Sequence, residues 1–171
     1  MIVGVLALLS VASQHRQPPS NEGIDDALHL VEWFQKVDSN VKLVVTNNES
    51  AKWILGDGFL TPDATGAWLS ETQGWIRFRT GEGTPVSVEL TVTPLLAPSI
   101  TERSITLATT VDELERTLRG GEERILLALD GETQQDVKFA CSEVESPQAL
   151  GLSVDQRPFC IKLLSVRVNV E

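Results

Sequence analysis

The sequence predicts a mostly β fold, an antiparallel β-sandwich of jelly-roll type preceded by one N-terminal amphipathic helix. From residue 41 onward, short runs that alternate apolar and polar residues are separated by glycine, proline and asparagine, a pattern typical of antiparallel β proteins. The chain of 171 residues has the size of one sandwich or barrel, and its 42% hydrophobic and 22% charged residues are the balance of a globular domain. We therefore expect one folded domain over residues 24–171.

The first 13 residues are interpreted as a targeting or membrane segment that precedes the domain. Residues 2–12 form an almost unbroken apolar run, too short to cross a bilayer at about 20 residues per span. With small residues at Ser10 and Ala12 the run suits a signal-peptide core, although no lysine or arginine precedes it. It also fits the end of a membrane helix from a longer protein. A buried strand ranks last, because the linker that follows would leave it far from the domain. The first two interpretations predict a protein that is exported or membrane-anchored, with its domain on the extracytoplasmic face.

Residues 14–23 concentrate proline, serine, asparagine and glycine, and we expect an extended linker there. Residues 24–37 carry apolar side chains at helical spacing and acidic residues near their start, which predicts the amphipathic helix. This helix would pack on an edge or end of the sandwich. Exposure of Trp33 and Phe34 would instead favour a role in docking to a partner.

After residue 41 we expect strands and no strong helix. In the strand at 75–80, Ile76 and Phe78 should point inward and Trp75 outward, because successive side chains of a strand alternate between its faces. The expected strands lie at residues 42–46, 67–70, 75–80, 86–93, 104–109, 137–141 and 159–170.

Two pairs of strands are expected to form hairpins. The glycine-rich turn at 81–85 predicts a hairpin of the strands on either side, in which Arg77 or Arg79 would meet Glu89. Residues 110–129 fit two structures. Residues 110–113 resemble a helix-capping box, whereas Gly120-Gly121 between two apolar runs indicates a second hairpin, which we favour.

The formal charge of -10 argues against nucleic acid or an anionic membrane as a partner and leaves neutral ligands such as sugars open. His15 falls in the linker and His29 on the helix, so no Ser-His-Asp or Cys-His arrangement is expected. The glycine-rich stretches lack the lysine and following helix of a phosphate loop, and no aspartate-rich loop signals calcium. We therefore expect a non-enzymatic protein without catalytic residues, metal or cofactor.

Cys141 and Cys160 are the two cysteines of the chain, and both fall in expected β segments that flank the loop at 146–157. They predict either a disulfide, if the two strands are neighbours in an oxidising compartment, or two buried thiols.

Two loops carry the candidate ligand-binding residues. Asp63 and Trp68 lie in the first, at 56–70, and Asp155 and Arg157 lie in the second, at 146–157. Each loop also has a structural interpretation. A tryptophan near a strand start is as often a core or rim residue as a sugar platform, and an Asp-x-Arg loop more often forms its own ion pair.

The same two loops resemble the ends of a known domain. GFLTPDATGAWLS resembles the pattern GFSxPExxGxWS, and SPQALGLSVDQRPFCIKL resembles SPxxLGxSxDxRxLGIxL. These patterns are found in the β-sandwich domain at the C-terminus of bacterial cell-envelope membrane proteins, many of them polysaccharide glycosyltransferases or phosphoglycerol-transferase relatives. The match runs from about residue 53 to 168. The departures are Leu60 for serine, Asp63 for glutamate, Leu69 as an extra residue, Phe159 for leucine and Cys160 for glycine.

The resemblance implies an accessory, carbohydrate-binding-like sandwich outside the membrane that associates with glycans and performs no catalysis. We expect an envelope saccharide to stack on Trp68 or Trp75. Asp63 and Asp155 would accept hydrogen bonds from its hydroxyls, and Arg157 would donate to them. The alternative is an assembly module that docks to a membrane-bound envelope enzyme without recognising sugar. An enzyme ranks third, since a glycosidase would need two carboxylates that face each other across a cleft and no pair in the sequence suggests one.

Overall fold

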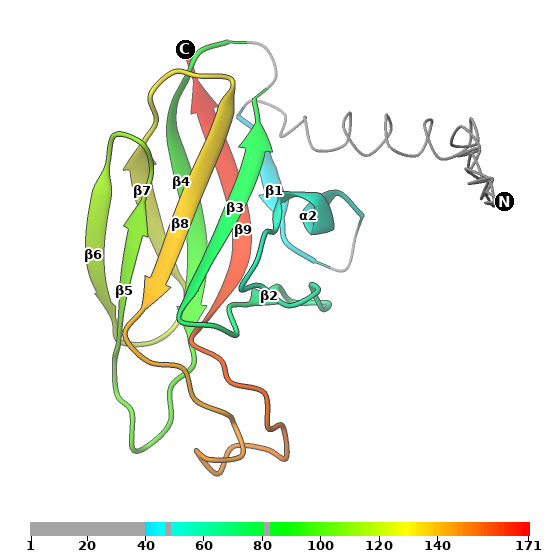
Figure 1. Ribbon diagram of the computed structural model, residues 1–171, viewed down its shortest axis with the longest axis vertical. Coiled ribbons are helices and arrows are strands. Elements are labelled where there is room, and N and C mark those ends of the chain that lie inside the picture. Colours follow the sequence, from blue (N-terminus) through cyan, green and yellow to red (C-terminus); the bar gives the residue numbers. More distant parts are fainter. Residues whose placement is uncertain (1–39, 47–48, 81–82) are drawn as a thin grey trace, which may run out of the picture.

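Two antiparallel β-sheets face each other in the computed structural model, which describes residues 40–46, 49–80 and 83–171 (Figure 1). One sheet has the order β1-β9-β4-β7, with β2 also paired to β9, and the other has the order β3-β8-β5-β6. This arrangement confirms the predicted β-sandwich. The helix predicted at 24–37 and the segments before it lie outside the described residues. The elements are β1 Lys42–Val44, α2 Glu49–Ile54, β2 Ala67–Trp68, β3 Gln73–Arg79, β4 Pro85–Pro94, β5 Arg103–Ala108, β6 Glu113–Leu118, β7 Glu123–Ala128, β8 Gln134–Cys141 and β9 Ile161–Val170.

The strand pairing is nested in the way that defines a jelly roll. At the centre β5 pairs with β6, and outward from it β4 pairs with β7, β3 with β8 and β2 with β9, all antiparallel. The chain is therefore wound like one long hairpin folded over on itself, and successive strands alternate between the sheets from β2 to β5 and again from β6 to β9. The last strand, β9, consequently lies inside its sheet, between β1 and β4.

Alternation of side chains along the strands builds the core between the sheets. In β3, Ile76 and Phe78 are fully buried as predicted, and in β4 the same holds for Val88, Leu90 and Val92. Each such side chain contributes about 1.5–3 kcal/mol of burial free energy. The opposite face of each strand is left on the outside of the sandwich, where polar side chains predominate in the sheet of β3, β8, β5 and β6.

Both predicted hairpins are wrong in their pairing, although their strands form. β3 pairs with β8 and β4 with β9 and β7, so Arg77 meets Asp136 of β8 and not Glu89. β6 and β7 likewise fall in different sheets, joined through Gly120 and Gly121. A glycine-rich turn in the sequence shows that the chain reverses; it does not show whether the next strand continues the same sheet or crosses to the other.

One short helix was not predicted. α2 occupies six residues in a region where we expected no strong helix, and it packs Ala51 and Ile54 into the core. Six residues are too few to show helical periodicity in the sequence. Such a short helix is stabilised by tertiary packing more than by its own propensity. In the part of the chain that the structure describes, no helix is both long and apolar enough to cross a membrane.

Candidate functional site

The structure divides the five predicted ligand-binding residues between two places. Asp63, Trp68, Asp155 and Arg157 gather beside the start of β9, at the end of the sandwich where the loop between β8 and β9 projects beyond the strands (Figure 1). Trp75 lies elsewhere, on the outer face of the sheet that contains β3.

The first group is built around two stacked aromatic rings. The Trp68 indole stacks on the ring of Phe159, with ring centroids 4.9 Å apart and an angle of 18° between the planes. The Lys162 ammonium lies 5.1 Å from the Trp68 centroid, and the Arg157 guanidinium carbon 5.5 Å from that of Phe159, both within the range of cation–π attraction. Trp68 meets Lys162 because they are cross-strand partners in the β2–β9 pairing. The Trp68 ring thus has partners within its own chain.

Asp63 closes the turn that leads into β2. Its Oδ1 accepts hydrogen bonds from the backbone N–H of Thr65 at 2.7 Å and of Gly66 at 3.1 Å, and its Oδ2 accepts one from Lys162 Nζ at 2.8 Å. Lys162, which is 8% exposed, also donates to Thr65 Oγ1. Burial alone would raise the pKa of Asp63, but the hydrogen bonds from Lys162 and Thr65 outweigh it and lower the pKa to about 2. Asp63 therefore stays ionised and holds its own turn.

Asp155 and Arg157 form the ion pair that their spacing suggested. Arg157 Nη2 donates to Asp155 Oδ2 at 2.6 Å and Arg157 Nε to Oδ1 at 3.0 Å, while the backbone N–H of Arg157 donates to the same Oδ1. The Arg157 side-chain hydrogen bonds lower the pKa of Asp155 to about 2. This fork closes the tip of the loop on itself, as an Asp-x-Arg pattern often does. The contacts proposed between these two residues and a sugar stay a prediction.

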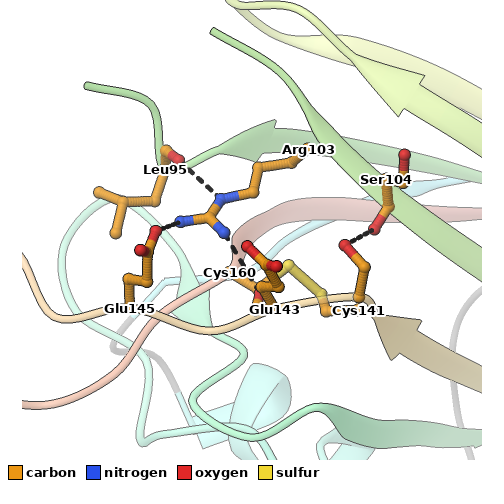
Figure 2. The surroundings of a disulfide bond; sticks show 8 residues. Leu95, Arg103, Ser104, Cys141, Glu143, Glu145 and Cys160 are labelled. Carbon is orange, nitrogen blue, oxygen red and sulfur yellow. Dashed lines mark hydrogen bonds and ion pairs between the residues drawn. A yellow bond between two sulfur atoms is a disulfide. The ribbon is translucent and has the colours of Figure 1, made fainter. Parts of the chain in front are cut away.

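The base of the same loop is fixed by a disulfide and a buried arginine. Cys141 at the end of β8 and Cys160 just before β9 are joined, which links the two sheets across a sequence separation of 19 residues. Of the two states that the sequence left open, the structure has the bonded one. Beside the disulfide lies Arg103, which is 3% exposed and donates Nε to the carbonyl of Leu95 and Nη2 to Glu145 Oε2 at 2.7 Å (Figure 2).

Arg103 was missed by sequence reasoning, which began the strand one residue later, at Ser104. The alternation of β5 puts Arg103 on the inward face with Ile105 and Leu107, where a charged side chain is unexpected. An arginine on the inward face of a predicted strand was the signal available, since a buried charge needs a partner.

The second place is a groove of about 550 Å³ on the outer face of the four-stranded sheet. Its volume is within the range of small-ligand sites, which run from about 300 to 1,000 Å³. It is lined by Asp57, Glu71, Gln73, Gly74, Trp75, Thr106, Ala108, Glu113, Lys138, Phe139 and Ala140.

The strand register explains how these residues meet. Trp75 is opposite Lys138, Lys138 opposite Ala108, and Ala108 opposite Glu113, which places one row of side chains across β3, β8, β5 and β6. The adjacent row contains Gln73, Ala140 and Thr106. Short side chains on β5 and β8 form the floor, and Trp75 stands on one side of it. The groove therefore offers an aromatic ring together with hydrogen-bonding groups of both kinds.

The Trp75 ring is held in place by its neighbours. Gly56 packs against the indole so closely that a Cβ there would lie 2.2 Å from ring atoms. The Arg77 guanidinium carbon lies 4.8 Å from the ring centroid, and Arg77 is itself fixed by Asp136 through bonds of 2.6 Å and 2.9 Å. The bonds to Asp136 raise the pKa of Arg77, so its charge is permanent. Trp75 is thus a rigid wall of the groove.

Sequence reasoning named Trp75 and missed the rest of the groove. Thr106, Glu113 and Lys138 all point outward on their strands, which alternation predicts, but their meeting depends on the pairing of β8 with both β3 and β5. Within the described ranges, no group of three or more histidine, cysteine, aspartate or glutamate residues is arranged to hold a metal ion.

Comparison with known proteins gives no family. No family model and no curated protein matches the sequence. The resemblance to the envelope-protein domain therefore stays a prediction.

Solved structures share an arrangement of strands with the chain only at low similarity. A GH115 4-O-methyl-α-glucuronidase with specificity for decorated arabinogalactans has a TM-score of 0.41 and 12% identity over 78% of this chain. An acetyl xylan esterase from the rumen bacterium Butyrivibrio proteoclasticus has a TM-score of 0.39 and 11% identity over 78%. The mosquito-larvicidal Cry4Aa toxin from Bacillus thuringiensis has a TM-score of 0.46 and 9% identity over 79%.

The chain spans 17%, 30% and 25% of the lengths of those three chains. At this similarity none of their activities transfers to it.

Proposed function

We propose that the domain is a non-catalytic module that binds a cell-envelope saccharide in the groove on the outer face of the β3-β8-β5-β6 sheet. The observation that carries the proposal is the fixed indole of Trp75 at the side of a groove of about 550 Å³. Sugar rings have apolar C–H faces that stack on an aromatic ring, and their hydroxyls both donate and accept hydrogen bonds.

The lining of the groove supplies the matching polar groups. Lys138 donates, Asp57, Glu71 and Glu113 accept, and Thr106 and Gln73 do both. Such a mixture suits a hydroxyl-rich ligand better than an apolar one. Trp75, named from the sequence as one of two candidate sugar platforms, is therefore the platform we favour, because it lines this groove and Trp68 does not.

An extracytoplasmic location is part of the proposal. The Cys141–Cys160 disulfide supports it, because such bonds persist in oxidising compartments and are rare in the reducing cytosol. The module would then meet envelope glycans directly. A fractionation of producing cells that found the chain reduced and cytosolic would contradict this location.

The test is an array of bacterial envelope glycans probed with the full chain and with two matched substitutions. Ala108→Phe fills the floor of the groove, and Ala128→Phe places the same side chain on the outer face of the other sheet, on β7. We expect A108F to lower binding at least tenfold, which is about 1.4 kcal/mol, and A128F to leave binding unchanged. Equal binding by wild type and A108F, or absence of binding to every glycan, would refute the proposal.

A second function is favoured by a separate observation, namely apolar side chains held in solvent on the loop between β8 and β9. Val154 is 89% exposed and Leu152 46% exposed, on a loop closed by the Asp155–Arg157 ion pair. Such residues suit docking to an apolar pocket of a membrane-bound envelope enzyme. Val154→Asp distinguishes the two functions: it should abolish association with such an enzyme and leave glycan binding intact.

A further inference from the structure

The charged side chains that line the groove affect whether it binds neutral or anionic saccharides. We propose that the groove selects an uncharged oligosaccharide, laid across the four strands, and excludes anionic glycans; this rests on the saccharide-binding function proposed above. The balance of charges in the groove, their positions and the length of the groove support this selectivity.

The lining residues carry more negative than positive charge. Three carboxylates, those of Asp57, Glu71 and Glu113, face the groove against one ammonium, that of Lys138. Within the described part of the chain none of these four groups forms an ion pair with another. The guanidinium of Arg77 adds nothing to the balance, because Asp136 matches its charge through two hydrogen bonds. An acidic ligand would therefore enter a site of its own sign.

The carboxylates lie toward both ends of the groove, and the ammonium lies between them. Glu113 is on the edge strand β6. Asp57 lies beside β3, where its backbone carbonyl accepts a hydrogen bond from the backbone N–H of Trp75. Lys138 is between these sides, opposite both Trp75 and Ala108. A saccharide that runs across the strands meets negative charge at either end of the groove. Its central hydroxyls meet the Lys138 ammonium, which donates hydrogen bonds to neutral and anionic sugars alike.

The row from Trp75 to Glu113 crosses four strands, or three inter-strand spacings. At about 4.8 Å per spacing it is roughly 14 Å long, which suits several linked sugar rings better than one. Ala108 in this row and Ala140 in the adjacent row have short side chains, which leave space above the floor. We therefore assign an oligosaccharide segment, with one of its rings against the Trp75 indole.

The test compares neutral hexasaccharides with counterparts that carry a carboxylate in place of each C6 hydroxymethyl group. Chains of glucose, mannose and galactose are each paired with the same chain oxidised to a uronic acid at every C6, and affinities are measured by calorimetry at low salt with the full chain. We expect the neutral member of at least one pair to bind at least tenfold more tightly. In Asp57→Asn/Glu71→Gln/Glu113→Gln the difference should shrink below threefold, mainly because the oxidised chain gains affinity.

A matched control separates the charge of the groove from that of the whole protein. Glu122→Gln/Glu132→Gln/Glu143→Gln changes the net charge equally at exposed positions outside the groove, and it should keep the tenfold preference. If oxidised chains bind wild type as well as neutral ones do, or if the control variant loses the preference to the same extent, the selectivity is refuted while saccharide binding stands. If no hexasaccharide binds wild type or either variant, both proposals fail.

Discussion

Trp68 and Phe159 lie face to face, with their ring centroids 4.9 Å apart, and connect the turn before β2 to the loop before β9. Each of the two stretches that resemble the envelope-protein domain contributes one of the rings. Around them, Lys162 with Asp63 and Arg157 with Asp155 place a charged pair beside each ring. Four of the five residues that we expected from the sequence to contact a ligand thus have partners within the chain, and the stack closes this end of the sandwich.

If the stack stabilises the fold, the two rings should be energetically coupled. We expect Trp68→Leu and Phe159→Leu each to lower the free energy of unfolding, and the double variant to lose less than the sum of the two. The coupling should be about 0.5–1.5 kcal/mol, the usual value for an aromatic pair beyond its buried area. Urea denaturation of all four proteins measures it. Additive losses would show that the rings act independently.

The disulfide should contribute strongly to stability because it closes a loop and joins the two sheets. For a loop of this length, with a sequence separation of 19, constraint of the unfolded chain amounts to about 3 kcal/mol. We expect reductant to lower the free energy of unfolding by this order. A Cys141→Ala/Cys160→Ala variant should start from the lower stability and show no response to reductant. Equal stability of the oxidised and reduced wild type would contradict this role.

The buried arginine should matter more than an exposed one. Arg103 is 3% exposed and its guanidinium is bonded to Leu95, Glu143 and Glu145. We expect Arg103→Met to cost about 1–3 kcal/mol, because buried acceptors lose their donor. The control is Arg119→Met, whose side chain is 75% exposed in its pair with Glu102 and which should cost less than about 0.5 kcal/mol. Similar losses in thermal or urea unfolding would rule out the anchoring role.

Stability should fall in acid within a defined range of pH. Asp63 and Asp155 each have a pKa of about 2 in the fold against an ordinary value of 3.8. Between these values the unfolded chain binds more protons, so the free energy of unfolding rises with pH there and is regained by about pH 5. Unfolding measured from pH 2 to pH 6 should show this slope. Asp63→Asn should reduce the slope, and an unchanged slope would mean that Asp63 gains nothing from Lys162 and Thr65.

The strand pattern of this fold could be predicted from the sequence, whereas the pairing of the strands could not. Alternation in 75–80 placed Ile76 and Phe78 in the core, as the structure confirms. The turn after this strand contains the glycines and proline of a hairpin, yet it connects two sheets. The pairing is between segments far apart in the sequence: β3 pairs with β8 and β4 with β9. The residues of the turn carry no information about either partner.

The candidate site was predictable to the same extent. Asp155 and Arg157 are two residues apart, so their ion pair follows from local geometry. The groove combines Trp75, Lys138, Ala108 and Glu113 from four strands, so it exists only once the register of β3, β8, β5 and β6 is fixed.

The most direct test of the account is to observe the Trp75 indole itself while saccharide is added. In nuclear magnetic resonance spectra of the ¹⁵N-labelled full chain, we expect neutral oligosaccharide that binds on the array to shift the Trp75 indole N–H signal. The amide signals of Thr106, Ala108 and Lys138 should shift with it, and those of Trp68 and Phe159 should stay in place. Shifts that centre on Trp68 and Phe159, with Trp75 unmoved, would contradict the account and place the ligand at the loop before β9.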